Sequence, residues 1–402
     1  MKPLARLLLA LVWLALPVSG GIASPLQKSG ELHPFIPRLA QPETDAPKPE
    51  TPTGDNALAA EIAKAEKELE RRRQPSAGLY GAGFRDKNDI SVMQGGLFAA
   101  ANFLDALNAR LLVMTGRLHQ DAKAQRRETD VWRTAASLGL ADLFLTPRIV
   151  LWGAAGCETF RLDSPEAQTT LDSEGGSVRW SRTPLYRGYV LGGRLGAKYV
   201  FDDESELGLE ASRESLWAGH DRFDVRLFNR VEDMTRMAAD MAADKVRGFA
   251  DIAAWPEQQL HLDGGFDSLE DGNFRKWGYA HYQFPVLWSR SRHWTVLRPN
   301  YYVESCNENK PGYFSPDYHM TTGVMLHTIQ EFTHVDLEAE VNPQLLWTKN
   351  QTKKGETQEG VHGLVNVAYK YEGLRLGVGG FAYVDTDDYW IYRANVFLKY
   401  TF

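Results

Sequence analysis

This 402-residue chain has little cysteine, few long apolar runs and no surplus of positive charge. Its two cysteines exclude a small secreted domain held together by disulfide bonds. The 45 Lys and Arg are outnumbered by 52 Asp and Glu, which argues against a nucleic-acid partner, because phosphate binding needs an excess of basic side chains. Beyond an early run, no segment offers the roughly 18 consecutive apolar residues of a transmembrane helix. The mean hydropathy of −0.37 agrees with that exclusion.

The N-terminus predicts export. Lys2 and Arg6 precede or flank the start of an apolar run, residues 7–16, and small residues at 21 and 23 follow it. This order is typical of a signal peptide, here residues 1–23 with cleavage after Ala23. The alternative, a membrane anchor, is disfavoured because the run is too short to span about 30 Å of hydrocarbon.

Two segments separate the signal peptide from the rest. Residues 24–54 are rich in proline and poor in large apolar side chains, which predicts a flexible periplasmic linker. Residues 55–73 are rich in Ala, Glu, Lys and Arg, begin at the N-cap candidate Asp55, and predict a short helix.

From residue 76 to 402 the pattern is that of β-strands with one apolar face. At the C-terminus, apolar and aromatic side chains alternate with a mostly polar set: Trp390, Tyr392, Ala394, Val396, Leu398, Tyr400 and Phe402 on one side, and Arg393, Asn395, Lys399 and Thr401 on the other. Successive side chains of a strand point to opposite faces, so each strand contacts two different environments. The segment holds about sixteen such strands.

Two all-β folds have this alternation. A soluble β-sandwich would turn its apolar face inward. A transmembrane β-barrel turns it toward lipid, and joins its strands by short turns on the periplasmic side and long loops on the other. Short and long connections alternate in this chain, for example 372–373 against 305–316, so we predict an outer-membrane barrel of about 16 strands. Residues 229–249, with apolar side chains at helical spacing, predict a helix at the periplasmic rim, either packed on the barrel mouth or acting as a gate or plug.

One element resembles a known family. Gly312-Tyr313-Phe314-Ser315-Pro316, followed by a strand, is similar to an element near the end of the C-terminal barrel of the bacterial cellulose synthase outer-membrane subunit. The resemblance implies the architecture of that family and of the poly-β-1,6-N-acetylglucosamine export porin, a 16-stranded barrel preceded by periplasmic tetratricopeptide repeats. This sequence departs from it, because no 34-residue repeat array is present and only residues 55–73 could correspond to a last repeat helix.

The face opposite the apolar one defines the predicted lumen. It mixes aromatic rings, which can stack on the apolar faces of sugars, with carboxylates and amides that pair with hydroxyls. The residues expected to line the pathway are Trp277, Tyr279, His281, Trp294, Arg298, Tyr302, Asp336, Glu338 and Glu340. The three acids would favour a neutral or partly cationic polymer. A polar interior is also the general rule for large barrels, so a general diffusion porin remains an alternative.

Catalysis is a further alternative. No Gly-x-Ser-x-Gly or His-Glu-x-x-His motif occurs, and the cysteines lack metal-ligand spacing. His220 with Asp221 and His261 with Asp263 are the candidates for a hydrolase site at the outer rim. Pairs of this kind are usually solvated, so we expect no enzyme activity, metal or cofactor.

The two cysteines, Cys157 and Cys306, both fall toward the long-loop rim, and an exported protein meets oxidising conditions. A disulfide between them is one interpretation, but their strands lie about six apart around the ring.

The sequence thus predicts a Gram-negative outer-membrane porin for exopolysaccharide export, with a role in biofilm. The expected partners are a polysaccharide, outer-membrane lipids and periplasmic scaffold or synthase components, without nucleic acid.

Overall fold

The computed structural model describes residues 74–103, 107–121, 129–146, 148–162, 187–201, 205–217, 234, 241–255, 258–288, 293–310, 312–350 and 354–402. The predicted signal peptide, linker and helix of residues 55–73 lie outside these ranges. No helix within them is long and apolar enough to cross a membrane.

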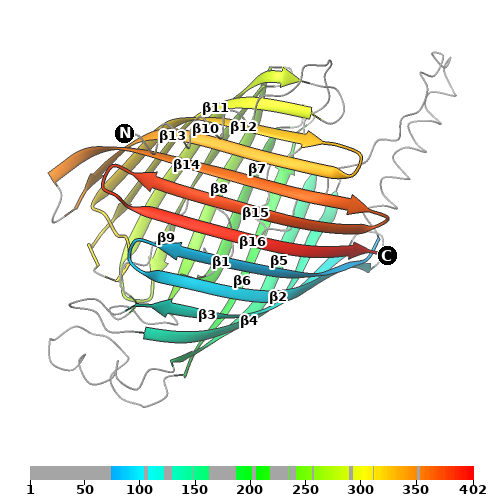
Figure 1. Cartoon of the computed structure of the whole chain (residues 1–402), viewed down its shortest axis with the longest axis horizontal. Coiled ribbons are helices and arrows are strands. Elements are labelled where there is room, and N and C mark those ends of the chain that lie inside the picture. The colour runs from blue at the N-terminus through cyan, green and yellow to red at the C-terminus, as the bar shows by residue number, and fades with distance from the viewer. Residues whose placement is uncertain are drawn as a thin grey trace.

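The described part of the chain is a closed antiparallel barrel in which each strand pairs with its sequence neighbours (Figure 1). The strands are β1 (Ser76–Asp86), β2 (Ile90–Phe103), β3 (Leu107–Gln120), β4 (Thr129–Thr146), β5 (Ile149–Leu162), β6 (Arg187–Val200), β7 (Glu206–Ser215), β8 (Ala242–Trp255), β9 (Gln258–Leu269), β10 (Phe274–Trp288), β11 (His293–Cys306), β12 (Tyr318–Glu331), β13 (Val335–Lys349), β14 (Lys354–Tyr371), β15 (Leu374–Asp385) and β16 (Trp390–Thr401). This confirms the predicted 16-stranded barrel and excludes the sandwich.

The first and last strands close the ring. β1 pairs with β16 in continuous register from Ser76 opposite Thr401 to Asp86 opposite Ile391. Beyond the last pair, the Phe402 amide donates to the Pro75 carbonyl at 2.9 Å. Closure leaves no unpaired sheet edge, which removes the groups through which open sheets aggregate.

Side chains alternate between an outer apolar surface and an inner polar one, as the sequence predicts. In β16 the buried residues Arg393, Asn395 and Lys399 alternate with the exposed residues Tyr392 and Val396. Large exposed apolar side chains occur on strands around the ring, and several are more than half exposed: Leu79, Met93, Leu97, Leu138, Tyr189, Leu191, Leu195, Leu207, Leu209, Val286, Leu345 and Val378. An apolar belt of this kind is suited to lipid contact.

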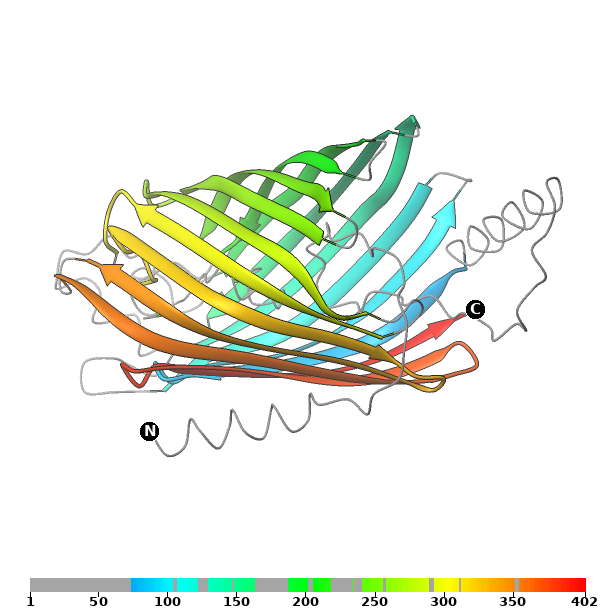
Figure 2. The ribbon, with the colours of Figure 1, turned by 90° about the horizontal axis from the view of Figure 1, so that it is seen from above.

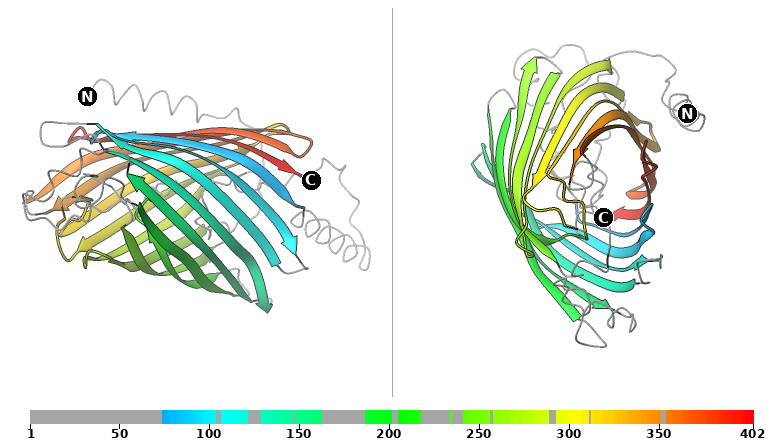
Figure 3. Two further views of the ribbon diagram at one scale, coloured as in Figure 1. Left: turned by 90° about the horizontal axis from the view of Figure 1, so that it is seen from below. Right: turned by 90° about the vertical axis from the view of Figure 1, so that its left-hand side faces the viewer.

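The two rims of the barrel differ in connection length. The rim at which β16 ends, called the short-turn rim below, has connections of two to five residues, such as 147–148, 201–205 and 372–373. The opposite long-loop rim has the longest ones, 163–186 and 216–241. Its connections 87–89, 270–273, 350–353 and 386–389 have only three or four residues, so the predicted alternation of short and long connections holds only in part. Figures 2 and 3 show the strands running obliquely between the rims, and the right panel of Figure 3 views the ring from the long-loop rim.

The prediction of a helix over residues 229–249 is wrong for residues 242–249, and the prediction that it lies at the short-turn rim is also wrong. Residues 242–249 begin strand β8, where inward Arg247 and Phe249 alternate with outward Val246 and Gly248. The connection before β8 follows the seventh strand, and an odd strand ends at the long-loop rim. The predicted gate or plug on residues 229–241 lies almost wholly outside the described residues, apart from Met234 and Met241.

Candidate functional site

The lumen is the candidate site, and its wall over β9–β12 is rich in aromatic rings. Trp277 and Tyr279 of β10 cluster with Tyr302 of β11. His261 stacks on His281 at 4.9 Å between ring centroids. All of these side chains point inward, as predicted for Trp277, Tyr279, His281 and Tyr302, and each exposes less than a tenth of its surface. Because these rings pack against one another, a molecule in the lumen would contact ring edges and polar atoms.

Hydrogen bonds fix this aromatic wall. Trp277 Nε1 donates to Asp267 at 3.4 Å, and the Tyr302 hydroxyl donates to Glu304 at 2.9 Å. Asp267 also accepts from Arg275 Nε at 2.8 Å. Because buried polar groups need partners, these bonds set the orientation of the rings.

Trp294 and Arg298 also lie where they were predicted, on the inward face of β11. The Arg298 guanidinium lies over the Trp294 ring, 5.7 Å from its centroid, and donates to Gln283 Oε1 at 2.8 and 3.0 Å. The indole meets His327 edge to face at 4.9 Å. The aromatic wall therefore extends from β10 to β12.

The three predicted acids face the lumen from β13, but each carboxylate has partners. Asp336 pairs with Lys370 at 2.5 Å and Arg375 at 2.8 Å. Glu338 pairs with His327 Nε2 at 3.0 Å and accepts from Asn366 at 3.0 Å. Glu340 pairs with His362 at 2.9 Å. Asp336 is therefore neutralised by two cations, whereas Glu338 and Glu340 are paired with imidazoles, which carry a positive charge only when protonated.

Of the hydrolase candidates, His261 and Asp263 do not lie at the outer rim. His261 and Asp263 lie within β9 and face the lumen, where His261 Nδ1 contacts Asp251 at 2.8 Å. Both oxygens of Asp263 accept from Arg247, at 2.8 and 2.7 Å. His220 and Asp221 lie outside the described residues. Within the part of the chain that the structure describes, no three His, Cys, Asp or Glu side chains are placed to hold a metal ion.

The two cysteines do not pair. Both are free thiols, and they belong to β5 and β11, six strands apart. Cys157 is the register partner of Leu191, which is 64% exposed on the outer surface, whereas Cys306 is buried. The strand order sets this separation, because both cysteines lie within strands.

The Gly312–Pro316 element folds inward at the long-loop rim. The Tyr313 hydroxyl donates to Asp271 at 2.9 Å and accepts from Asn273 Nδ2 at 3.0 Å, which ties the β11–β12 loop to the β9–β10 turn. Burial raises the pKa of Tyr313, so its hydroxyl stays protonated and can donate. Ser315 Oγ accepts from the Lys310 amide at 2.5 Å, and Phe314 meets His319 edge to face at 5.2 Å.

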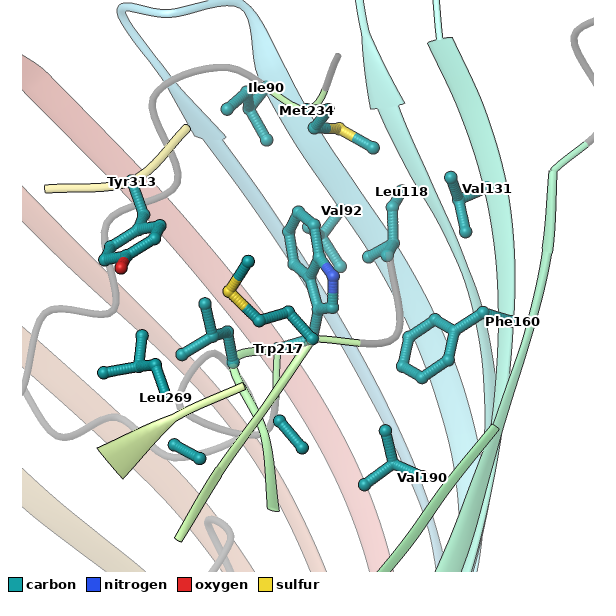
Figure 4. Packing of buried hydrophobic residues seen from close by; sticks show 14 residues of the cluster. Ile90, Val92, Leu118, Val131, Phe160, Val190, Trp217, Met234, Leu269 and Tyr313 are labelled. Atoms are coloured by element: carbon teal, nitrogen blue, oxygen red, sulfur yellow. The ribbon is translucent and has the colours of Figure 1, made fainter. Parts of the chain in front are cut away.

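An apolar cluster fills the long-loop end of the lumen, and sequence reasoning missed it. We call it the mouth cluster; it comprises Ile90, Val92, Leu118, Val131, Phe160, Val190, Leu216, Trp217, Met234, Met241, Ala242, Ala243, Leu269 and Tyr313. Figure 4 shows Trp217 between Val92 and Leu118 on one side and Leu269 and Tyr313 on the other. Because β2 and β9 lie nearly opposite in the ring, the cluster crosses the mouth. The sequence did contain a sign of this cluster, because apolar residues interrupt the inward-facing polar pattern at the strand ends on this rim.

Comparison with known proteins supports the fold. No protein-family model matches the chain, and no curated protein does. Among solved structures it is similar to a bacterial polysaccharide outer membrane secretin, with a TM-score of 0.54 and 12% identity over 82% of this chain and 99% of that one. CdiB from Acinetobacter baumannii has a TM-score of 0.48 and 8% identity, covering 81% and 60% of the two chains. A CymD monoaromatic hydrocarbon channel has a TM-score of 0.40 and 8% identity, covering 87% and 93%. The likeness to the secretin shows a shared fold, that of an outer-membrane β-barrel.

Proposed function

We propose that the protein is an outer-membrane channel that conducts a polysaccharide out of a Gram-negative cell. The observation that carries the proposal is the inward wall of β9–β13, where aromatic rings alternate with carboxylates, amides and imidazoles. Hydroxyl-rich chains can pair with such polar groups and pack against the rings. The fold shared with a protein described as a polysaccharide secretin supports the same assignment.

The apolar belt sets the orientation of this channel in the membrane. Outer-membrane barrels keep short turns in the periplasm and long loops outside, so the polymer enters at the short-turn rim and leaves past the mouth cluster. Outer-membrane lipids contact the belt, and the synthase or a separate scaffold delivers the polymer from the periplasm. Since Glu338 and Glu340 form ion pairs only with histidines among the described residues, we expect the lining to suit a neutral or partly cationic polymer.

Deletion of the gene tests the export function. Surface polysaccharide should disappear while polymer accumulates in the periplasm, and biofilm should decrease. Unchanged surface polymer would refute the proposal.

Planar bilayers separate a polysaccharide conduit from a general diffusion porin. Neutral oligosaccharides should block the single-channel current of a conduit, and Tyr302→Ala should weaken this block. Tyr301→Ala is the matched control, because Tyr301 is the adjacent residue of β11 and is 40% exposed on the outer surface. A current that oligosaccharides do not reduce would favour a general diffusion porin.

A further inference from the structure

Two cations are neighbours in the short-turn half of the lumen. Arg375 of β15 and Lys399 of β16 are direct register partners, and both side chains face inward. Like charges directly opposite each other on neighbouring strands are destabilising. Asp336 pairs with Arg375 at 2.8 Å and compensates that guanidinium, whereas no acid pairs with Lys399 among the described residues.

Lys399 differs from the other lysines that face the lumen within the described strands. Lys198 pairs with Glu206 at 3.0 Å, Lys245 with Glu214 at 2.6 Å and Lys370 with Asp336 at 2.5 Å. Lys399 is only 5% exposed, yet it has no ion pair or hydrogen bond among the residues that the structure describes.

Within the described part of the chain, no carboxylate pairs with Lys399. Asp336, the acid that binds its register partner Arg375, also bonds Lys370. In the other direction the register partner of Lys399 is Gly78, which has no side chain, and the Phe98 ring occupies the space where its Cβ would lie. A buried ammonium without an anionic partner is costly, because burial removes it from water.

The geometry points to a binding site for an oxyanion, a carboxylate or phosphate, held by Lys399 and its register partner Arg375. A guanidinium presents parallel N–H donors to such a group, and an ammonium adds a compact charge. The anion would give Lys399 the partner that it lacks and reduce its repulsion with Arg375. The anion could be a free phosphate or a charged substituent of a passing polymer. Binding of free phosphate does not depend on the proposed export function, whereas binding of a polymer substituent rests on it.

Thermal unfolding of the purified full-length protein in detergent tests the site. Inorganic phosphate is compared with chloride at equal ionic strength, and unfolding is followed by tryptophan fluorescence. A ligand that binds only the folded state raises the unfolding temperature, here by about 2 to 4 °C for the wild type. Lys399→Gln should unfold at a higher temperature than the wild type in chloride, since the repulsion is gone, and should lose the phosphate effect.

Two variants serve as controls. Lys399→Arg keeps the charge and should keep the phosphate effect. Lys276→Gln removes the same charge from an exposed position of β10 and should also keep it. The proposal is overturned if phosphate does not stabilise the wild type, or if it stabilises Lys399→Gln equally.

Oligosaccharides then identify the source of the anion. An oligogalacturonate that acts at lower concentration than phosphate, in a Lys399-dependent way, indicates a polymer carboxylate. An effect of phosphate alone indicates the free ion. Equal Lys399-dependent stabilisation by a neutral cello-oligosaccharide would overturn the oxyanion site.

Discussion

At the scale of single residues, the lumen wall depends on glycines that leave room for flat aromatic rings. A Cβ at Gly377 would lie 2.1 Å from the Phe397 ring, and one at Gly78 would lie 2.3 Å from the Phe98 ring. Each ring is on a neighbouring strand at the same register position, and each is buried against the wall. The rings therefore lie flat along the wall because the glycines add no side chain beneath them.

Gly377→Ala should destabilise the barrel, because Phe397 must leave its position and neighbouring strands cannot open without losing ladder hydrogen bonds. We expect a loss of about 1 to 3 kcal/mol, measured as a lower unfolding temperature. Gly380→Ala is the matched control on the same strand, since its Cβ would meet only the Arg393 carbonyl oxygen at 3.8 Å. Equal effects of the two substitutions would contradict this packing account.

At the scale of elements, the β11–β12 loop is held in place by contacts to the β9–β10 turn. Asn273 Nδ2 donates to the Glu308 carbonyl at 2.8 Å, and the Glu308 amide donates to Asn273 Oδ1 at 3.0 Å. Tyr313 adds its hydroxyl to the same group and its ring to the mouth cluster. The loop is thus fixed by a polar contact and an apolar one.

Tyr313→Phe keeps the ring and removes the polar contact, which typically costs about 1 to 3 kcal/mol where a buried partner is left unsatisfied. We expect faster cleavage of the folded protein by a glutamate-specific protease after Glu308, in the same loop. Tyr392→Phe, on the exposed outer surface of β16, should leave the cleavage rate unchanged. Identical rates in Tyr313→Phe and wild type would show that the hydrogen bonds do not hold the loop.

At the scale of the whole molecule, the ring of sixteen paired strands should resist unfolding in detergent. Each strand is paired with a neighbour on both sides, so no edge is available from which the ring can open. We expect the unheated protein to migrate differently from the boiled protein on electrophoresis. The same mobility before and after boiling would count against a stable barrel.

The mouth cluster should limit passage through this ring. Trp217 is 1% exposed and is the largest of its fully buried side chains. Trp217→Ala should raise single-channel conductance, because it leaves space in the middle of the cluster, and should lower the unfolding temperature. Trp132→Ala removes a tryptophan that is 45% exposed on the outer surface and should not change conductance. A conductance unaffected by Trp217→Ala would mean that the cluster does not obstruct the path.

The sequence correctly predicted features that depend only on the alternation of side chains along a strand, such as the two faces of β16. It failed at residues 242–249, where methionines at helical spacing upstream concealed the alternation of Arg247 and Phe249. In the lumen, the alternation of side chains along each strand correctly predicted that Trp277 and Glu340 face inward. It could not predict that Glu340 pairs with His362, because His362 lies on another strand. No local pattern shows which inward cation meets which acid.

The sequence by itself determined the number of strands, the direction that each side chain faces and the asymmetry of the rims, because alternation and turn length are local properties of the chain. The tertiary structure decided which charges are neutralised, that Cys157 and Cys306 stay apart, that apolar residues cross the mouth, and that Lys399 lies opposite Arg375, which Asp336 already binds. These depend on register and on contacts between residues distant in sequence, which only the closed ring brings together.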